Sequence, residues 1–210
     1  MTGRIIETAE DIEEGMAWLC RAEPRFAEAY AQTGPLPLRR RKGGFQALLN
    51  TICAQQLSVA AADSVWKKLC AAKANSPKRF LELGEDELRA CGLSRPKIRY
   101  ARALAEAGIN YRRLASMPED EAIATLTEVK GIGVWTAEIY LMFSVGRADV
   151  IACGDLALQE AARIIFGLDD RPTDKDLRAL AEPWSPWRAV AARLLWAYYR
   201  VAKNREGIVE

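Results

Sequence analysis

The chain has 210 residues, 50% of them hydrophobic and 28% charged, which is enough to bury a substantial core in one domain or in two small lobes. Its formal net charge is only +2, so no broad basic surface marks a nucleic-acid partner, and DNA binding would rest on a few contacts. The sequence contains no histidine, which excludes Ser-His and Cys-His catalysis and argues against a zinc site. Carboxylates, backbone amides, aromatic side chains, lysine and arginine must therefore supply any chemistry.

Cysteine usage and the N-terminal sequence indicate the compartment. The five cysteines are scattered rather than clustered, as expected of reduced thiols packed in a cytoplasmic protein. Residues 1–14 are acidic and lack the apolar core of a signal peptide. Charged residues interrupt every apolar run well before the ~20 residues that a membrane helix needs. We expect a cytoplasmic monomer without membrane association, located at the nucleoid if the chain is bacterial.

Apolar residues recur with helical spacing along most of the chain, and the alternation typical of strands is nearly absent. The predicted fold class is all-α, with short connections between helices. Ser58 and Ser94 stand where they can cap helices, and glycines stand where several helices should end. In chain order, the predicted helices span residues 9–22, 44–56, 58–73, 85–91, 95–108, 118–127, 134–145, 155–166, 173–182 and 186–203. The helical pattern breaks most clearly at 33–44 and again near 146–151.

A two-glycine turn between two helical patterns is the most informative motif. It reads Leu126-x-x-Val129-x-Gly131-Ile132-Gly133-x-x-Thr136-Ala137. Glycines leave backbone N–H groups open to a phosphate, and a helix that starts at Val134 would direct its positive dipole end toward that phosphate. The alternative is a purely structural helix–turn–helix. Lys130 would add a phosphate contact or would simply be a solvated turn residue.

Asp155 follows Gly133 by 22 residues and opens another amphipathic helix, within Cys153-Gly154-Asp155. Taken alone, an aspartate at this place is an ordinary N-cap. The start of a helix also favours the ionised form of a carboxylate, which can stabilise developing positive charge.

The hairpin and the aspartate together resemble the helix-hairpin-helix plus Gly-Pro-Asp signature of the base-excision DNA glycosylase superfamily, and within it the 3-methyladenine DNA glycosylase II family. The usual proline is missing, so the match rests on the Gly-Asp pair and its spacing. The resemblance runs from about Gly43 to Tyr199. It implies two helical lobes with a substrate cleft between them. Residues 43–149 would form the middle lobe with the hairpin at about 121–145, and 1–42 plus 150–210 the lobe that carries Asp155.

The resemblance implies that Asp155 is the catalytic carboxylate of an N-glycosidic bond hydrolysis. Breaking that bond builds positive charge on the deoxyribose, which a fixed anion stabilises. A cationic alkylated purine leaves as a neutral base, so one carboxylate suffices and no general acid is needed. Trp135 stands where bifunctional glycosylases carry a Schiff-base lysine, so no strand cleavage is expected.

Aromatic and neighbouring residues define the expected base pocket. The electron-rich face of Trp135 would attract a cationic base. The resemblance implies that Trp196 also lines the pocket; the alternative is that Trp196 is a core residue. Ile139 stands where relatives carry a tyrosine, with Tyr140 next to it on another helical face. This departure bears on pocket shape and substrate range.

Polar Gln55 and Gln56 interrupt an apolar helix just before Leu57 and the capping Ser58. The resemblance implies that this corner carries the wedge that fills the gap left by a flipped nucleotide. Gln56 is the best match for the wedge, with Leu57 and Gln55 beside it, and Gln55 also borders the pocket. The alternative is a plain corner between helices. The expected DNA-binding residues are Gln56, Leu57, Lys130, Gly131, Gly133, Val134 and Thr136.

Two further segments are open to two interpretations. Arg39 to Lys42 would follow the DNA backbone or form a solvated loop. The segment from Trp184 to Arg188 is similar to a family motif that opens the last helix, and we expect it to seat Trp196, with Arg188 near Asp155 or a phosphate.

The sequence therefore predicts a monofunctional DNA glycosylase acting on duplex DNA that contains alkylated bases, with 3-methyladenine or 7-methylguanine as leading substrates. No cofactor and no catalytic metal are expected; the resemblance implies a monovalent cation held by hairpin carbonyls. The alternatives are a non-catalytic helix-hairpin-helix DNA-binding protein and a glycosylase of another branch, acting on mismatched or oxidised bases.

Overall fold

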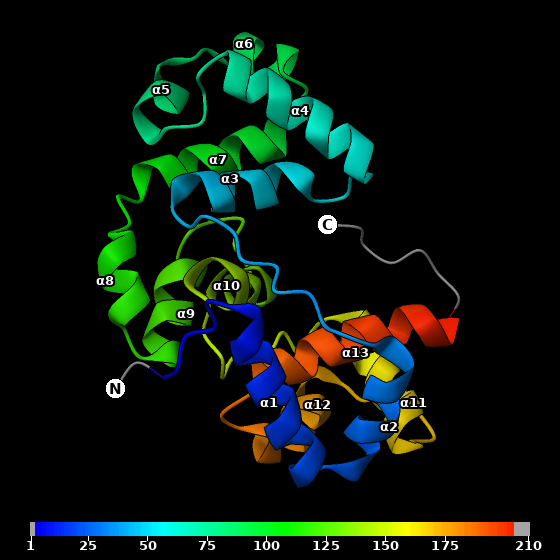
Figure 1. Cartoon of the computed structure of the whole chain (residues 1–210). Coiled ribbons are helices and arrows are strands. Elements are labelled where there is room, and N and C mark those ends of the chain that lie inside the picture. Colours follow the sequence, from blue (N-terminus) through cyan, green and yellow to red (C-terminus); the bar gives the residue numbers. More distant parts are fainter. Residues whose placement is uncertain (1–2, 204–210) are drawn as a thin grey trace. The chain divides into compact units, whose positions relative to one another are not determined.

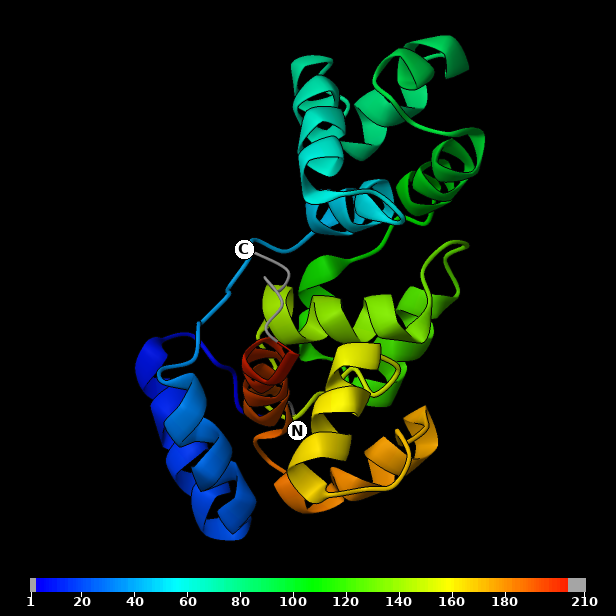
Figure 2. The same ribbon diagram turned by 90° about the vertical axis from the view of Figure 1, so that its right-hand side faces the viewer.

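The computed structural model describes residues 3–203, and the chain forms two compact units (Figures 1 and 2). Unit 1 comprises Met1–Arg40 and Leu141–Glu210, and unit 2 comprises Arg41–Tyr140. The boundaries expected from the sequence were 43 and 149. Residues 141–149 therefore belong to unit 1 and not to the middle segment, while residues 1–2 and 204–210 of the predicted lobes lie outside the described residues.

The all-α prediction is confirmed: the described residues form helices, with one isolated β-bridge between Ile5 and Arg147. The helices of unit 1 are α1 (Ala9–Ala22), α2 (Pro24–Thr33), the π-helical turn η1 (Leu141–Val145), α11 (Leu156–Phe166), α12 (Asp174–Leu180), the 3₁₀ turn η2 (Glu182–Trp184) and α13 (Arg188–Lys203). Those of unit 2 are α3 (Phe45–Ala54), α4 (Val59–Ala71), α5 (Pro77–Glu82), α6 (Glu85–Ala90), α7 (Arg95–Glu106), α8 (Tyr111–Ser116), α9 (Glu119–Thr127) and α10 (Val134–Tyr140).

Three helices were not predicted, and one predicted helix changes type. Helices α5 and α8 have only six residues each, too few for an apolar period to emerge. Helix α6 is equally short, but Gly92 follows it as a signal for a helix end. Helix α2 buries only Phe26 and Ala29, and its start depends on Pro24 and on the Glu23 side chain, which accepts from the Arg25 N–H. The helix predicted over 134–145 ends at Tyr140 and continues as the π-helical turn η1.

Helix α13 is the centre of unit 1. Figure 2 shows it between the α1–α2 pair and α11, and it packs against all three. Every residue from Ala189 to Leu195 is buried, and the alanines in this run allow close approach from several sides. Phe26 of α2 meets the rings of Phe166 and Trp184 edge-on, so the aromatic core joins α2, α11 and η2.

Unit 2 is built around α3 and α7, which lie side by side in Figure 1. The Lys97 ammonium donates to the Cys53 carbonyl across 2.6 Å and ties the start of α7 to the last turn of α3. Burial raises the pKa of the Cys53 thiol to about 12, so this thiol is inert at neutral pH. Phe45 and Phe80 meet with ring centroids 6.5 Å apart. The hydrogen bond from Lys97 thus holds the last turn of α3, from which the corner leading to α4 begins.

None of the helices in the described part of the chain combines the length and the apolar character that a membrane span requires.

Gly15 marks the closest approach between α1 and the segment that opens α13. A Cβ at Gly15 would lie 2.7 Å from the Trp187 ring and 2.8 Å from Val190. Both neighbours are buried, so they have no room to move. Gly15→Ala should lower the free energy of unfolding by about 1–2 kcal/mol, although alanine is the better helix former.

Chemical denaturation measures this effect, and Gly3→Ala, where a Cβ meets nothing within 4 Å, is the control. A Gly15→Ala protein as stable as the wild type would contradict the close packing.

Candidate functional site

The hairpin turn joins α9 to α10 and is held by its own backbone. Ile132 is buried, and its N–H donates to the Val129 carbonyl across 3.0 Å. Gly131 has a φ of +96°, a left-handed conformation that favours glycine, and a Cβ at this position would overlap the ring of Tyr100. The fold itself therefore requires glycine at 131.

Gly133 differs from Gly131 in both respects. It is exposed, its backbone is outside the left-handed region, and a Cβ there would meet nothing within 4 Å. Nothing inside the protein requires a glycine here. The open space lies at the start of α10, where backbone N–H groups can receive an acceptor from outside.

The residues after Gly133 divide into exposed and buried ones. Val134 is 48% exposed and Trp135 is 40% exposed, which is high for such large apolar side chains. Thr136 is buried, so it packs inside unit 2 and its predicted direct contact with DNA is not carried forward. Lys130 is exposed at the other end of the turn.

Tyr140 and Ile139 also differ from one another. Tyr140 is buried, its hydroxyl accepts from the Gly44 N–H across 2.8 Å, and its ring lies 6.4 Å from that of Tyr111. Burial raises the pKa of Tyr140, so its hydroxyl stays protonated. These contacts give Tyr140 a structural role, and the proposed base pocket does not include it. Ile139 is half-buried.

The corner between α3 and α4 lies against the hairpin. The Gln55 side-chain amide donates to the Gly131 carbonyl across 3.4 Å. Gln56 has a φ of +58°, which is uncommon for a residue with a side chain and is concentrated at functional turns. Leu57 is 40% exposed and Val59 is 54% exposed. The corner thus projects a polar and an apolar side chain from a rigid base.

Asp155 is the N-cap of α11. Its Oδ1 accepts from the Ala157 N–H at 2.9 Å and from the Leu158 N–H at 3.2 Å. The same oxygen accepts from the indole N–H of Trp196 at 3.2 Å. Asp155 is partly exposed. A carboxylate held by three donors keeps a fixed position while remaining accessible.

Trp196 is half-buried on α13 and lies against Phe143 of η1, with ring centroids 5.7 Å apart and planes inclined by 34°. The guanidinium of Arg193 lies 4.8 Å from the centre of the Phe143 ring. Phe143 and Arg193 were missed by the sequence analysis. A signal for Arg193 existed, since it is the one charged residue within the apolar run from Ala189 to Ala197.

The sequence leaves two interpretations open for residues 39–42 and for residues 184–188. Arg40, Trp184 and Arg188 from these segments make contacts within unit 1. Arg40 donates to the carbonyls of Phe143 and Ser144, at 3.3 and 3.0 Å, so it is not a freely solvated cation. Arg188 pairs with Asp149 at 3.4 Å rather than with Asp155. Trp184 stacks with Phe166 in the aromatic core of unit 1.

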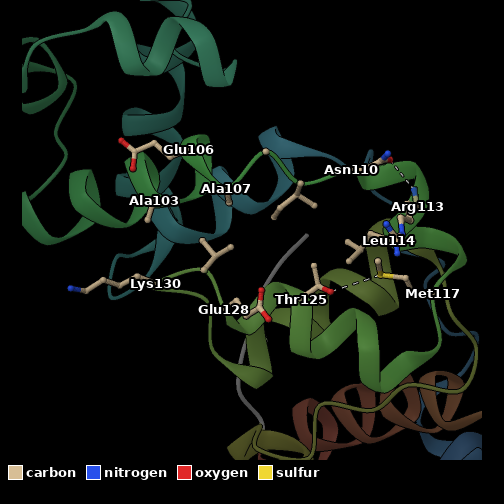
Figure 3. Close-up of a pocket in the computed structure, with 13 residues that line it drawn as sticks. Ala103, Glu106, Ala107, Asn110, Arg113, Leu114, Met117, Thr125, Glu128 and Lys130 are labelled. Atoms are coloured by element: carbon tan, nitrogen blue, oxygen red, sulfur yellow. Dashed lines mark hydrogen bonds between the residues drawn. The ribbon is translucent and has the colours of Figure 1, made fainter.

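A cavity of about 620 Å³ opens within unit 2 (Figure 3). Ala103 and Glu106 of α7 lie on one side of it, and Thr125 of α9 and Glu128, which follows α9, lie on the other. Lys130 is the predicted site residue that borders it. Among the described residues, no three His, Cys, Asp or Glu side chains gather as a metal site would require.

The contrast between the two hairpin glycines is testable by stability. Gly131→Ala should cost at least about 2 kcal/mol, because alanine is strained at this φ and overlaps Tyr100. Gly133→Ala should stay within about 0.5 kcal/mol of the wild type, since its Cβ enters open space.

Urea denaturation of the two variants provides the comparison. Equal losses of stability at both positions would contradict the distinction between a glycine that the fold needs and one that it does not.

Three comparisons place the chain among known proteins. The family model of the HhH-GPD superfamily base excision DNA repair protein matches residues 49–186. The alkylbase DNA glycosidase-like protein mag2 of Schizosaccharomyces pombe is 28% identical over 198 residues, which are 89% of this chain and 93% of the relative. DNA-3-methyladenine glycosylase 1 of the same yeast is 30% identical over 171 residues, 77% of this chain and 75% of the relative.

A solved structure agrees with these sequence relatives. The crystal structure of a DNA-3-methyladenine glycosidase from Bacillus halodurans matches with a TM-score of 0.81 and 29% identity, covering 89% of each chain. The matched segment 49–186 contains both the two-glycine hairpin and Asp155. The chain therefore belongs to the HhH-GPD superfamily of base excision DNA repair proteins.

Proposed function

We propose that this protein is a monofunctional DNA glycosylase that removes alkylated purines of the 3-methyladenine and 7-methylguanine type from duplex DNA. The observation that carries the proposal is the Asp155 carboxylate, fixed at the start of α11 by two backbone N–H groups and the Trp196 indole. Family membership and the DNA-3-methyladenine glycosylases among the relatives support the same activity.

Asp155 would act on the sugar rather than on the base. When the bond between C1′ and the purine nitrogen breaks, its electron pair leaves with the base and positive charge develops on the deoxyribose. A fixed carboxylate stabilises this charge without reorganising. Water then adds to C1′ and loses a proton, which leaves an abasic site. A purine that is already cationic through alkylation departs neutral, so the reaction needs no acid, and the chain has no histidine to supply one.

Trp135 would select the base. It cannot form a Schiff base with the sugar, so the reaction proposed is hydrolysis without cleavage of the strand. Its exposed indole offers an electron-rich face to an extruded base. A cationic base gains about 0.5–2 kcal/mol from such a contact, whereas a neutral base gains only stacking.

The hairpin and the α3–α4 corner would hold the DNA. Gly133 and Val134 are exposed residues, and a Cβ at Gly133 would meet nothing within 4 Å. Their N–H groups would bind a phosphate, and Lys130 would add a positive charge beside it. Gln56 and Leu57 project from the corner and would fill the space of the extruded nucleotide. The hydrogen bond from Gln55 to the Gly131 carbonyl would hold the α3–α4 corner and the hairpin in fixed positions relative to one another.

The hairpin also suits a monovalent cation. The carbonyls of Val129, Gly131 and Gly133 each accept one hydrogen bond, from Ile132, Gln55 and Ala137, and a carbonyl oxygen has two acceptor positions. These oxygens would hold the cation, which would add positive charge beside a DNA phosphate. We further propose that the protein acts as a monomer.

Asp155→Asn tests the chemistry directly. Asparagine retains a side-chain oxygen for the cap of α11 but has no charge, so the fold should persist while base release slows by at least about 100-fold. Single-turnover formation of abasic sites in a duplex with one 7-methylguanine measures this rate.

Asp176→Asn is the matched control, because Asp176 also accepts a backbone N–H at the start of a helix, α12, in the same unit. Release by Asp155→Asn at the wild-type rate would refute the proposed role of Asp155, whereas a wild-type protein that releases no alkylated base would favour a non-catalytic DNA-binding protein.

Trp135→Leu tests base selection. The variant should lose about 3–30-fold in kcat/KM for cationic 7-methylguanine and clearly less for neutral hypoxanthine, because only the cationic base loses a cation–π contact. The two substrates, placed in the same duplex sequence, control for each other. Equal losses on both would remove the electrostatic part of the argument.

A further inference from the structure

We infer that Phe143 is a positioning residue for the reaction: it holds the Trp196 indole in the orientation in which its N–H fixes Asp155. The inference rests on the proposed function, and it concerns side chains of unit 1 alone. Three contacts in sequence carry it, from Arg193 to Phe143, from Phe143 to Trp196 and from Trp196 to Asp155.

The Phe143 ring has two close neighbours, both from α13. The Trp196 ring lies 5.7 Å away, and the Arg193 guanidinium lies 4.8 Å from the Phe143 centroid. Phe143 is only 6% exposed, so solvent does not compete for these contacts. Because the Phe143 ring is buried and makes both contacts, it limits the rotamers that the Trp196 indole can adopt.

The main chain of Phe143 is also held. Its carbonyl and that of Ser144 accept from the Arg40 guanidinium, at 3.3 and 3.0 Å. Gly146, two residues on from Ser144, has a φ of +90°, and Arg40 occupies the space that a Cβ there would take. The π-helical turn η1 therefore cannot shift without breaking the contacts of Arg40. Such turns are rare and are enriched at functional sites.

Arg193, the charged residue that contacts the Phe143 ring, is unusually deeply buried for an arginine. It is 2% exposed and lies three residues before Trp196 on α13. Within the described residues its hydrogen bonds go to the carbonyls of Ala189, at 2.7 Å, and Leu38, at 3.1 Å, rather than to a carboxylate. Burial, with Arg39 and Arg40 nearby, lowers the pKa of Arg193 to about 9, so it remains charged at neutral pH.

A buried cation without a carboxylate partner costs stability, and an apolar residue would fill this place at lower cost. What the guanidinium adds is a cation on the Phe143 ring, which stabilises that ring in one orientation. The same helix then delivers Trp196 one turn later with its N–H on Asp155. The energetic cost of Arg193 is thus consistent with fixing the aromatic pair.

Loss of the Phe143 ring should therefore affect the chemical step more than binding. Asp155 keeps its two backbone donors, so α11 stays capped, but Trp196 is freer to turn away from Oδ1. Phe143→Leu should lower kcat about tenfold, the size of one lost aromatic contact, and should change KM by less than about twofold.

Phe26→Leu is the matched control. Phe26 is also a fully buried phenylalanine of unit 1 with two aromatic neighbours, Phe166 and Trp184, neither of which belongs to the site. Both variants are compared at a temperature at which thermal unfolding shows them folded. Phe143→Met, a second apolar replacement without a ring, is used if Phe143→Leu does not fold.

A double-mutant cycle identifies the route of the effect. If Phe143 acts through Trp196, then Phe143→Leu should cost little further rate in a Trp196→Phe background. An undiminished tenfold loss in that background, or an equal loss of kcat in Phe26→Leu, would overturn the inference.

Hydrogen exchange of the indole N–H separates this inference from the proposed function. The Trp196 signal is assigned by its disappearance in Trp196→Phe, and its exchange should be several-fold faster in Phe143→Leu and unchanged in Phe26→Leu. Unchanged exchange in Phe143→Leu would overturn the inference even if the enzyme is active. A wild-type protein that releases no alkylated base would instead overturn the proposed function, and the exchange data would still judge whether Phe143 holds Trp196.

Discussion

The proposed chemistry depends on one oxygen, Oδ1 of Asp155, and on the groups that hold it. Two of its donors come from the first turn of α11 and the third from the Trp196 side chain on α13. The packing of α11 on α13 is therefore what sets the position of the carboxylate. Three N–H groups directed at one oxygen hold the carboxylate in place, and the proposed mechanism requires a fixed carboxylate beside the developing oxocarbenium ion. The buried run of α13 thus serves both as the core of unit 1 and as the support of its reactive group.

The two glycines of the hairpin in unit 2, Gly131 and Gly133, differ in whether the fold requires a glycine. Gly131 is required by its left-handed backbone and by the Tyr100 ring, whereas nothing inside the protein requires Gly133. A glycine that the fold does not need, placed at the exposed start of a helix, leaves room for a group from outside. This difference fits the proposed contact of the turn with a DNA phosphate, and the sequence pattern alone does not distinguish the two glycines.

The sequence predicted the long helices well, because α1, α9, α11 and the others with several buried residues repeat their apolar positions over two or more turns. It missed α5 and α8, which are too short for a period, and η1, since a π-helical turn has no pattern of its own. The sequence singles out the hairpin, Asp155 and Trp135 because their residue types and spacing resemble the family motif, and their roles in the reaction belong to the proposed function. The contacts of Phe143, Arg193 and Arg40 bring together positions far apart in the chain, and the burial of Tyr140 and its hydrogen bond with Gly44 likewise depend on the fold and not on a local pattern.

Mass analysis of what the protein releases from methylated duplex DNA tests the central claim most directly. The account predicts free 3-methyladenine or 7-methylguanine in the supernatant, with abasic sites left in unbroken strands. Release of no methylated base, or strand cleavage that accompanies release and traps a covalent complex under borohydride, would contradict it.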